Sequence, residues 1–160
     1  MKYRKLKPEE LEPLKEDFIQ FLAANTITGD DWAKTKAEKP EEAEKIIALF
    51  SDIVWEKSLE KIHYLEHRDE RYLKVFHFGE KEVTMVGFSV TADNAPSLLA
   101  EDTFTRLGSG DLKFSELNAE FYKSAKTYEK DRQVVMFEMI EAGCQPCDEA
   151  YFYGIKSLMK

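Results

Sequence analysis

The chain contains one string whose residue types and spacing match a known hydrolytic site. His63-Tyr64-Leu65-Glu66-His67 fits the H-x-x-E-H pattern of inverted zinc peptidases. In those enzymes two histidines one helical turn apart bind zinc, and the glutamate activates the bound water. Because the charged residues 68–71 follow directly, we predict that the string ends a helix and that His63 and His67 face solvent. A metal-dependent hydrolase at this string is one hypothesis for function.

Two cysteines form a second candidate site. Cys144-Gln145-Pro146-Cys147 has the C-x2-C spacing of metal chelation and the C-x-P-C form of thioredoxin-like dithiols. A four-ligand zinc site would need His63 and His67 as its other half. A redox dithiol normally follows a strand, whereas we expect a helix here, and Asp148 would oppose a thiolate. We prefer a third interpretation, two reduced thiols in a connection between helices.

Composition and charge exclude several classes of function. The 160 residues include 31 acidic and 23 basic side chains, which gives a net charge of −8. A negative surface repels phosphate groups, so we expect neither a nucleic-acid partner nor an anionic membrane surface. No run reaches 18 apolar residues, and the basic start of the chain leads into Pro8-Glu9-Glu10 rather than an apolar stretch. We therefore expect a cytoplasmic protein with reduced cysteines, folded as a single globular domain over residues 1–160.

Helices are predicted along most of the chain. Pro8 can open a helix that stops near Asn25, because proline needs no amide partner in the first turn. Thr28 is a candidate N-cap for a short helix that runs until Pro40. Apolar residues at three- and four-residue spacing continue this prediction over residues 41–67, 115–143 and 148–159. Gly143 can end the second of these helices, and Asp148 can cap the last.

One region alternates with a period of two. Residues 72–78 and 82–91 alternate between apolar and polar side chains, and Gly79 lies in the link between them. The predicted fold class is therefore α+β: a mainly helical single domain of about five or six helices, with one antiparallel β-hairpin at about 72–91. Two strands alone are marginally stable, so we expect the hairpin to pack against helices.

Four segments resemble an uncharacterised family of small proteins from Bacteroidetes. They are Met1–Leu6, Phe21–Thr28, Phe50–Glu56 and Tyr64–Arg68. The resemblance covers most of the chain, and it implies a bacterial, cytoplasmic, single-domain protein. It brings no known activity, cofactor or catalytic residue.

The leading hypothesis for function is a non-enzymatic protein-binding or regulatory domain. This hypothesis depends on the absence from the sequence of a recognisable group of catalytic residues. The candidate interaction surfaces are Trp32 with the turn at residues 25–31, and Tyr151 and Tyr153 on the last helix. The partner would be another protein or a second copy of this chain. A structural zinc site of His63, His67, Cys144 and Cys147 ranks second and the hydrolase third. We expect no cofactor, with zinc as the alternative, and we assign no catalytic residue.

Overall fold

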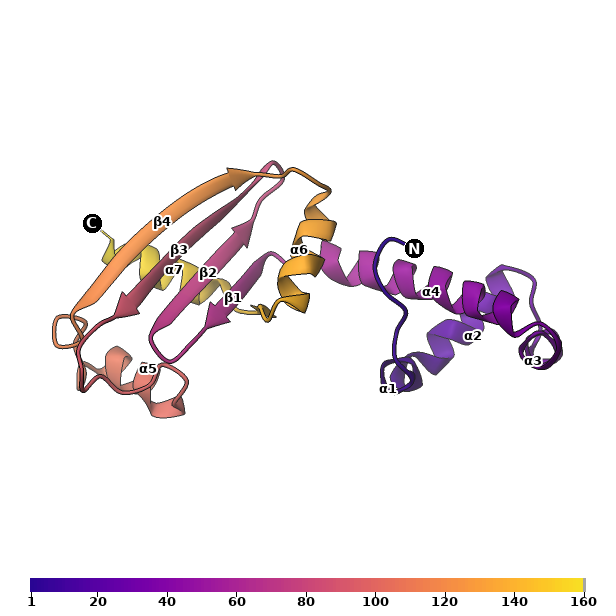
Figure 1. The fold of residues 1–160 in the computed structure, drawn as a ribbon, viewed down its shortest axis with the longest axis horizontal. Helices are drawn as coiled ribbons and strands as arrows, with labels where there is room; N and C mark the ends of the chain where they lie inside the picture. The colour runs from indigo at the N-terminus through magenta and orange to yellow at the C-terminus, as the bar shows by residue number, and fades with distance from the viewer. Residues whose placement is uncertain (160) are drawn as a thin grey trace. The chain divides into compact units, whose positions relative to one another are not determined.

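The computed structural model of the chain describes residues 1–159 (Figure 1). Contacts within the chain divide it into two units, Met1–Glu60 and Lys61–Lys160. The first is helical and the second is built on an antiparallel sheet. The α+β class is thus confirmed, while a single domain over residues 1–160 stays a prediction. Within residues 1–159, no helix combines the length and the apolar character needed to cross a membrane.

The first unit is a set of short helices ahead of one long helix. Its elements are α1 (Pro8–Leu11), the 3-10 turn η1 (Glu12–Leu14), α2 (Lys15–Ala24), α3 (Gly29–Glu38) and α4 (Pro40–Glu60). Pro8 opens α1 and Asn25 ends α2, as predicted. Thr28 caps α3 as predicted: its side chain accepts a hydrogen bond from the amide of Asp31, and the Asp31 carboxylate accepts one from the Thr28 amide.

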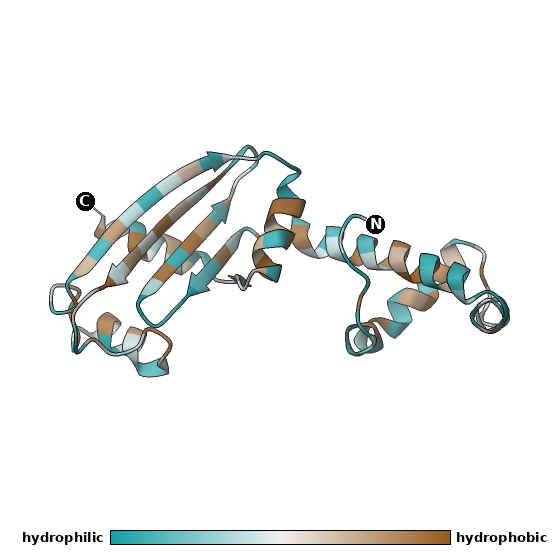
Figure 2. Ribbon diagram, in the orientation of Figure 1, coloured by the Kyte–Doolittle hydropathy of each residue, from teal (hydrophilic) through white to brown (hydrophobic). Residues whose placement is uncertain are grey.

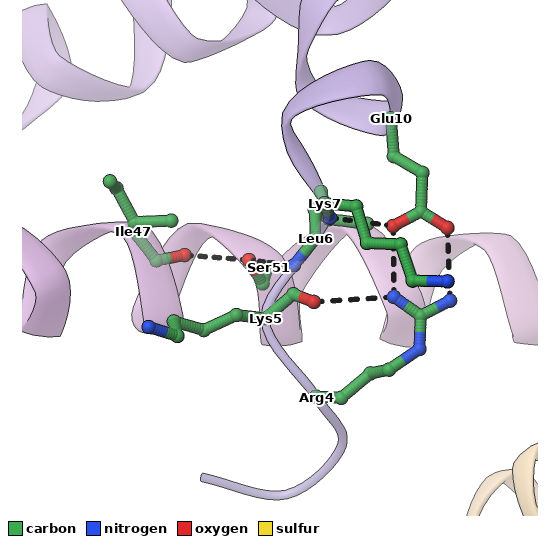
Figure 3. Close-up of polar contacts among 7 residues, drawn as sticks. All are labelled: Arg4, Lys5, Leu6, Lys7, Glu10, Ile47 and Ser51. Carbon is green, nitrogen blue, oxygen red and sulfur yellow. Dashed lines mark hydrogen bonds and ion pairs between the residues drawn. The ribbon is translucent and has the colours of Figure 1, made fainter.

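The N-terminal segment is held on α4 by a buried hydrogen bond and on α1 by a part-buried ion pair (Figure 3). The amide of Leu6 donates to Ser51 Oγ at 2.9 Å, and Ser51 donates to the carbonyl of Ile47 at 2.7 Å. Arg4 forms a two-pronged ion pair with Glu10, at 2.8 and 2.9 Å. Because Ser51 is fully buried, its hydroxyl gives this segment a fixed register on the helix.

The second unit is a five-stranded antiparallel sheet with three helices. The strands are β1 (Tyr64–Arg68), β2 (Tyr72–Phe78), β3 (Glu82–Val90), β4 (Ala119–Thr127) and β5 (Gln145–Pro146), in the spatial order β4-β3-β2-β1-β5. The helices are α5 (Glu101–Ser109), α6 (Arg132–Glu141) and α7 (Glu149–Leu158). Figure 1 shows α7, in yellow, crossing one face of the sheet, where it contacts β2 and β3.

The core of this unit lies on the face that α7 covers. Strand register places Leu73, Val75, Val86 and Phe88 on that face, and Phe152 of α7 packs against them in one buried cluster. Figure 2 shows hydrophobic residues along the middle strands and recurring hydrophilic bands along β4, as expected for an edge strand. The opposite face buries its own residues near α6, including Leu65, Phe78 and Met136.

Two helix predictions are wrong at one end: the first helix ends earlier than predicted, and the second begins later. The helix expected over 41–67 ends at Glu60. Tyr64–Arg68 is instead the strand β1, which pairs with β2 on one side and with the edge strand β5 on the other. The helix expected over 115–143 begins only at Arg132, because Ala119–Thr127 is β4. The predicted hairpin is present as β2 and β3, but it is the middle of a larger sheet. The predicted helix end at Gly143, which has a positive φ, and the predicted N-cap of the last helix at Asp148 are confirmed.

Candidate functional site

The H-x-x-E-H string does not form the geometry of a helical zinc site. His63 directly precedes β1 and His67 lies within it, so the two are separated by about 13 Å of extended chain rather than by one helical turn. His63 is exposed, whereas His67 is half-buried and its Nδ1 lies 2.8 Å from Tyr72 Oη. The predicted helical arrangement is therefore wrong, and the string loses its physical basis as a hydrolytic centre.

The sheet does bring the cysteine segment beside the histidine segment. β5 pairs with β1, so that Glu66 lies opposite Gln145 and the amide of Cys147 donates to the carbonyl of Tyr64. His67 lies next to the turn before Cys144, since its Nε2 is 3.6 Å from where a Cβ on Gly143 would stand. From the sequence, the two segments were predicted to meet only if they shared a zinc ion. In the structure they meet because β1 and β5 pair as strands.

The two cysteines nevertheless lie on opposite faces of the sheet. Cys147 packs against the core on the α7 side, while the charge acting on Cys144 is that of Lys74, on the other face. Across residues 1–159, no three His, Cys, Asp or Glu side chains are grouped so as to hold a metal ion. Zinc binding by all four predicted ligands stays an untested prediction.

Both thiols are held in the protonated form. Burial, followed by the negative charges of Glu66 and Asp148, raises the pKa of Cys147 to about 12. Burial also raises the pKa of Cys144. Since the thiolate is both the nucleophile and the metal ligand, these surroundings favour the interpretation of two reduced thiols over redox or metal chemistry.

The predicted surface at Trp32 lines an apolar groove in the first unit. The groove has a volume of about 660 Å³, within the range of roughly 300–1,000 Å³ found for ligand sites. Ile27, Thr28 and Gly29 of the predicted 25–31 turn line it together with Trp32. The sequence thus located one wall of this groove.

The other walls come from α1, α2 and α4, and the sequence did not indicate them. Phe18 meets the Trp32 ring edge-on at a centroid distance of 5.1 Å, and Ile47 of α4 also lines the groove. Ile19 lines it as well and is 56% exposed, so it presents apolar surface to solvent next to the other apolar side chains of the groove. Its exposure is the feature that marks the groove as an open surface.

Charged residues stand at the edge of the apolar groove. Glu12, Lys15 and Lys36 line it, and the Lys36 ammonium lies 5.7 Å from the centre of the Trp32 ring. Lys15 has no ion-pair partner within residues 1–159. The groove therefore carries two positive charges and one negative, in a unit whose 14 acidic and 10 basic side chains give a net charge of −4.

The second predicted surface is partly used within the molecule. Tyr151 is 38% exposed and lies against Arg68 and Phe104. Tyr153 is 53% exposed, and its hydroxyl meets that of Tyr64 at 3.5 Å. This hydrogen bond, with burial, raises the pKa of Tyr64 to about 12. Phe152 between them is buried in the core, so the three consecutive aromatic residues of α7 face different directions.

Comparison with known proteins assigns the chain to a family without assigning it an activity. No curated protein and no solved structure matches the chain. A family model matches the chain from residue 1 to residue 160, and through it the chain belongs to a family of unknown function (DUF6495).

Proposed function

We propose that the chain is a non-enzymatic binding domain that docks a short amphipathic segment of a partner protein in the groove of the first unit. The groove supplies apolar contact area from Trp32, Phe18 and Ile19, and aromatic residues in such a setting commonly anchor protein interfaces. The observation that carries the proposal is the exposed Ile19 beside Trp32 in an open apolar groove.

The charges at the edge of the groove specify the partner segment. Lys15 and Lys36 outnumber Glu12, so an acidic side chain next to the apolar anchors is complementary to the groove, and a basic one is not. The segment we infer has two or three large apolar residues that fill the groove and an Asp or Glu that reaches Lys15. An amphipathic helix or a short extended peptide can present such residues, with the apolar side chains on one face and the acidic side chain beside them.

The location and source of the protein follow from its chemistry. We infer a cytoplasmic location, because the two cysteines are free and kept protonated by their surroundings, which suits a reducing compartment. The resemblance of four segments to proteins from Bacteroidetes supports a bacterial source. A second copy of the chain as partner is the alternative occupant. We propose no nucleic-acid partner, no membrane partner and no cofactor.

Selection from a displayed library of random twelve-residue peptides on the full-length chain tests the proposal. We expect enriched peptides to combine apolar anchors with an acidic residue. Ile19→Gln should weaken their binding at least tenfold, because it removes apolar area from the groove. Leu49→Gln is the matched control, since Leu49 is 55% exposed but does not line the groove.

The charge requirement has its own test. Lys15→Gln should weaken binding of the acidic peptides about three- to tenfold and leave binding of their Asn or Gln versions unchanged. The proposal would be refuted by enriched peptides that bind the Ile19→Gln and Leu49→Gln variants equally well. Failure of selection to enrich any peptide above background would count against it too.

A further inference from the structure

A second cavity lies in residues 61–160, between α7 and the face of the sheet that α7 covers. Its volume is about 630 Å³. Three strands and one helix contribute to its lining: His77 from β2, Thr84 from β3, Lys123 from β4, and Phe152, Tyr153 and Lys156 from α7. The cavity is thus built from elements of one unit and is independent of the groove described above.

Strand register explains why these polar side chains meet. Tyr64, His77, Thr84 and Ala125 lie opposite one another across four strands, so their side chains share one face. Lys123 lies in the next row, opposite Val86, on the same face. Because Ala125 is small, the row leaves space at the β4 end, and Lys156 from α7 reaches the same region.

Four polar side chains of this cavity have neither an ion-pair nor a hydrogen-bond partner within residues 1–159. Among the described residues, no Asp or Glu lines the cavity. In the same part of the chain, Lys123 and Lys156 have no ion-pair partner, and the side chains of Thr84 and His77 have no hydrogen-bond partner. Both lysines are exposed, and the Lys156 ammonium lies 6.0 Å from the centre of the Phe152 ring, so both ammonium groups are open to a ligand that enters the cavity.

The pKa of His77 is shifted by the same excess of positive charge. Burial lowers the pKa of His77, and the charges of His63, Arg132 and Lys156 lower it further. No carboxylate acts in the opposite direction. His77 is stacked on Tyr64 at a centroid distance of 4.8 Å, so its ring is fixed while its nitrogens stay available to a ligand.

We propose that this cavity binds an oxyanion, the phosphate or carboxylate group of a small molecule. Lys123 and Lys156 supply charge-assisted donors, and the Thr84 hydroxyl and the His77 imidazole supply two more. Phe152 and Tyr153 form an aromatic wall that can contact the organic part of the ligand. The ligand therefore supplies the negative charge that the protein omits at this place.

NMR titration of the full-length chain with inorganic phosphate and with citrate tests this proposal, with sodium chloride at matched ionic strength as reference. We expect saturable shifts of the amide signals of Thr84, Lys123 and Lys156. Lys123→Gln and Lys156→Gln should each weaken binding at least fivefold. The matched control is Lys126→Gln: Lys126 is on the same strand but on the opposite face, where it pairs with Glu129 at 3.8 Å.

Proton uptake gives a second readout that distinguishes a bound anion from general charge screening. His77 faces Tyr64 of β1, Thr84 of β3, Lys123 of β4 and Lys156 and Tyr153 of α7. It also lines a neighbouring pocket with Lys61, His63, Cys147 and Glu149, and the charge of Arg132 acts on it. An anion placed among these groups raises the pKa of His77, so binding of sulfate, whose charge is constant between about pH 5 and 8, should tighten as the pH falls. His77→Gln should abolish this dependence.

Two results would overturn the proposal. One is a set of shifts with phosphate and citrate no larger than those with chloride. The other is a Lys126→Gln variant that weakens binding as much as Lys123→Gln does. Each variant is first compared with the parent chain by its amide spectrum, so that a loss of binding is measured only on folded protein.

Discussion

At the residue scale, Ser51 shows how one hydroxyl positions a whole segment. It is fully buried, accepts the Leu6 amide and donates to Ile47. Ser51→Ala would leave the Leu6 amide buried without its acceptor, which costs about 1–3 kcal/mol of unfolding free energy. Urea denaturation measures this loss. Ser58→Ala, at an exposed site on the same helix, should change the free energy by less than about 0.5 kcal/mol.

Glu10 gives the N-terminal segment a dependence on pH. The hydrogen bond from Arg4, then that from the Lys7 amide, lower the pKa of Glu10 from 4.5 to about 2. Since the folded pKa is below the unfolded one, the stabilisation is complete above about pH 4.5 and is lost as the pH falls toward 2. We therefore expect unfolding free energy to fall more steeply over this window in the parent chain than in Glu10→Gln.

The control for that measurement is the neighbouring acid. Glu9 is exposed and has no ion-pair partner among the described residues, so Glu9→Gln should follow the parent curve. Parallel curves for Glu10→Gln and the parent would contradict the assigned role of the Arg4 contact. Urea midpoints collected from pH 5 to pH 2 at constant salt provide the comparison.

At the element scale, the errors of sequence-based prediction have a common cause. Leu117, Phe121 and Ala125 recur every four residues, a spacing that suits one face of a helix but is also an even number, so it suits one face of a strand equally. The pairing of β4 with β3 over its full length decided in favour of the strand. Helix caps were predicted correctly because Thr28 and Asp148 act through their own local hydrogen bonds.

The residues of the candidate sites also divide into those with a local signal in the sequence and those placed by long-range packing. Trp32 and the 25–31 turn could be selected from the sequence because a large aromatic residue beside a turn is a local signal. Ile19 and Lys156 could not, since the walls they form exist only after distant helices and strands have packed. The sheet faces on which Cys144 and Cys147 lie could not be predicted either. They depend on the strand β5, which has two residues and so shows no alternating pattern in the sequence.

Gly87 on β3 offers a test of how tightly the sheet elements are packed. A Cβ at this position would lie 2.7 Å from the Leu73 carbonyl oxygen and 2.9 Å from the Tyr122 ring, so Gly87→Ala should cost about 1–3 kcal/mol. Gly154→Ala in α7 is the opposite case: nothing lies within 4 Å of its Cβ, and helix propensity predicts a gain of about 0.5–1 kcal/mol. Chemical denaturation of both variants should therefore give shifts of opposite sign.

At the scale of the whole molecule, net charge and local charge point to different partners. The chain carries −8 overall, which disfavours polyanions at long range. The groove of the first unit and the cavity under α7 are both lined by lysines that have no ion-pair partner within residues 1–159, and these favour acidic ligands at short range. The two observations are compatible if the ligands are small or carry few charges, because a small anion meets only the local field.

The division into two units leads to a prediction about folding. All five strands and every member of the ten-residue core cluster belong to residues 61–160, and about 100 residues suffice for an independent core. Residues 61–160 expressed alone should therefore fold, with dispersed amide signals and a cooperative thermal transition, while residues 1–60 alone should be marginal. If 61–160 stays unfolded until 1–60 is restored, the chain folds as the one domain that its sequence predicted, and the stability of the sheet depends on the helical unit.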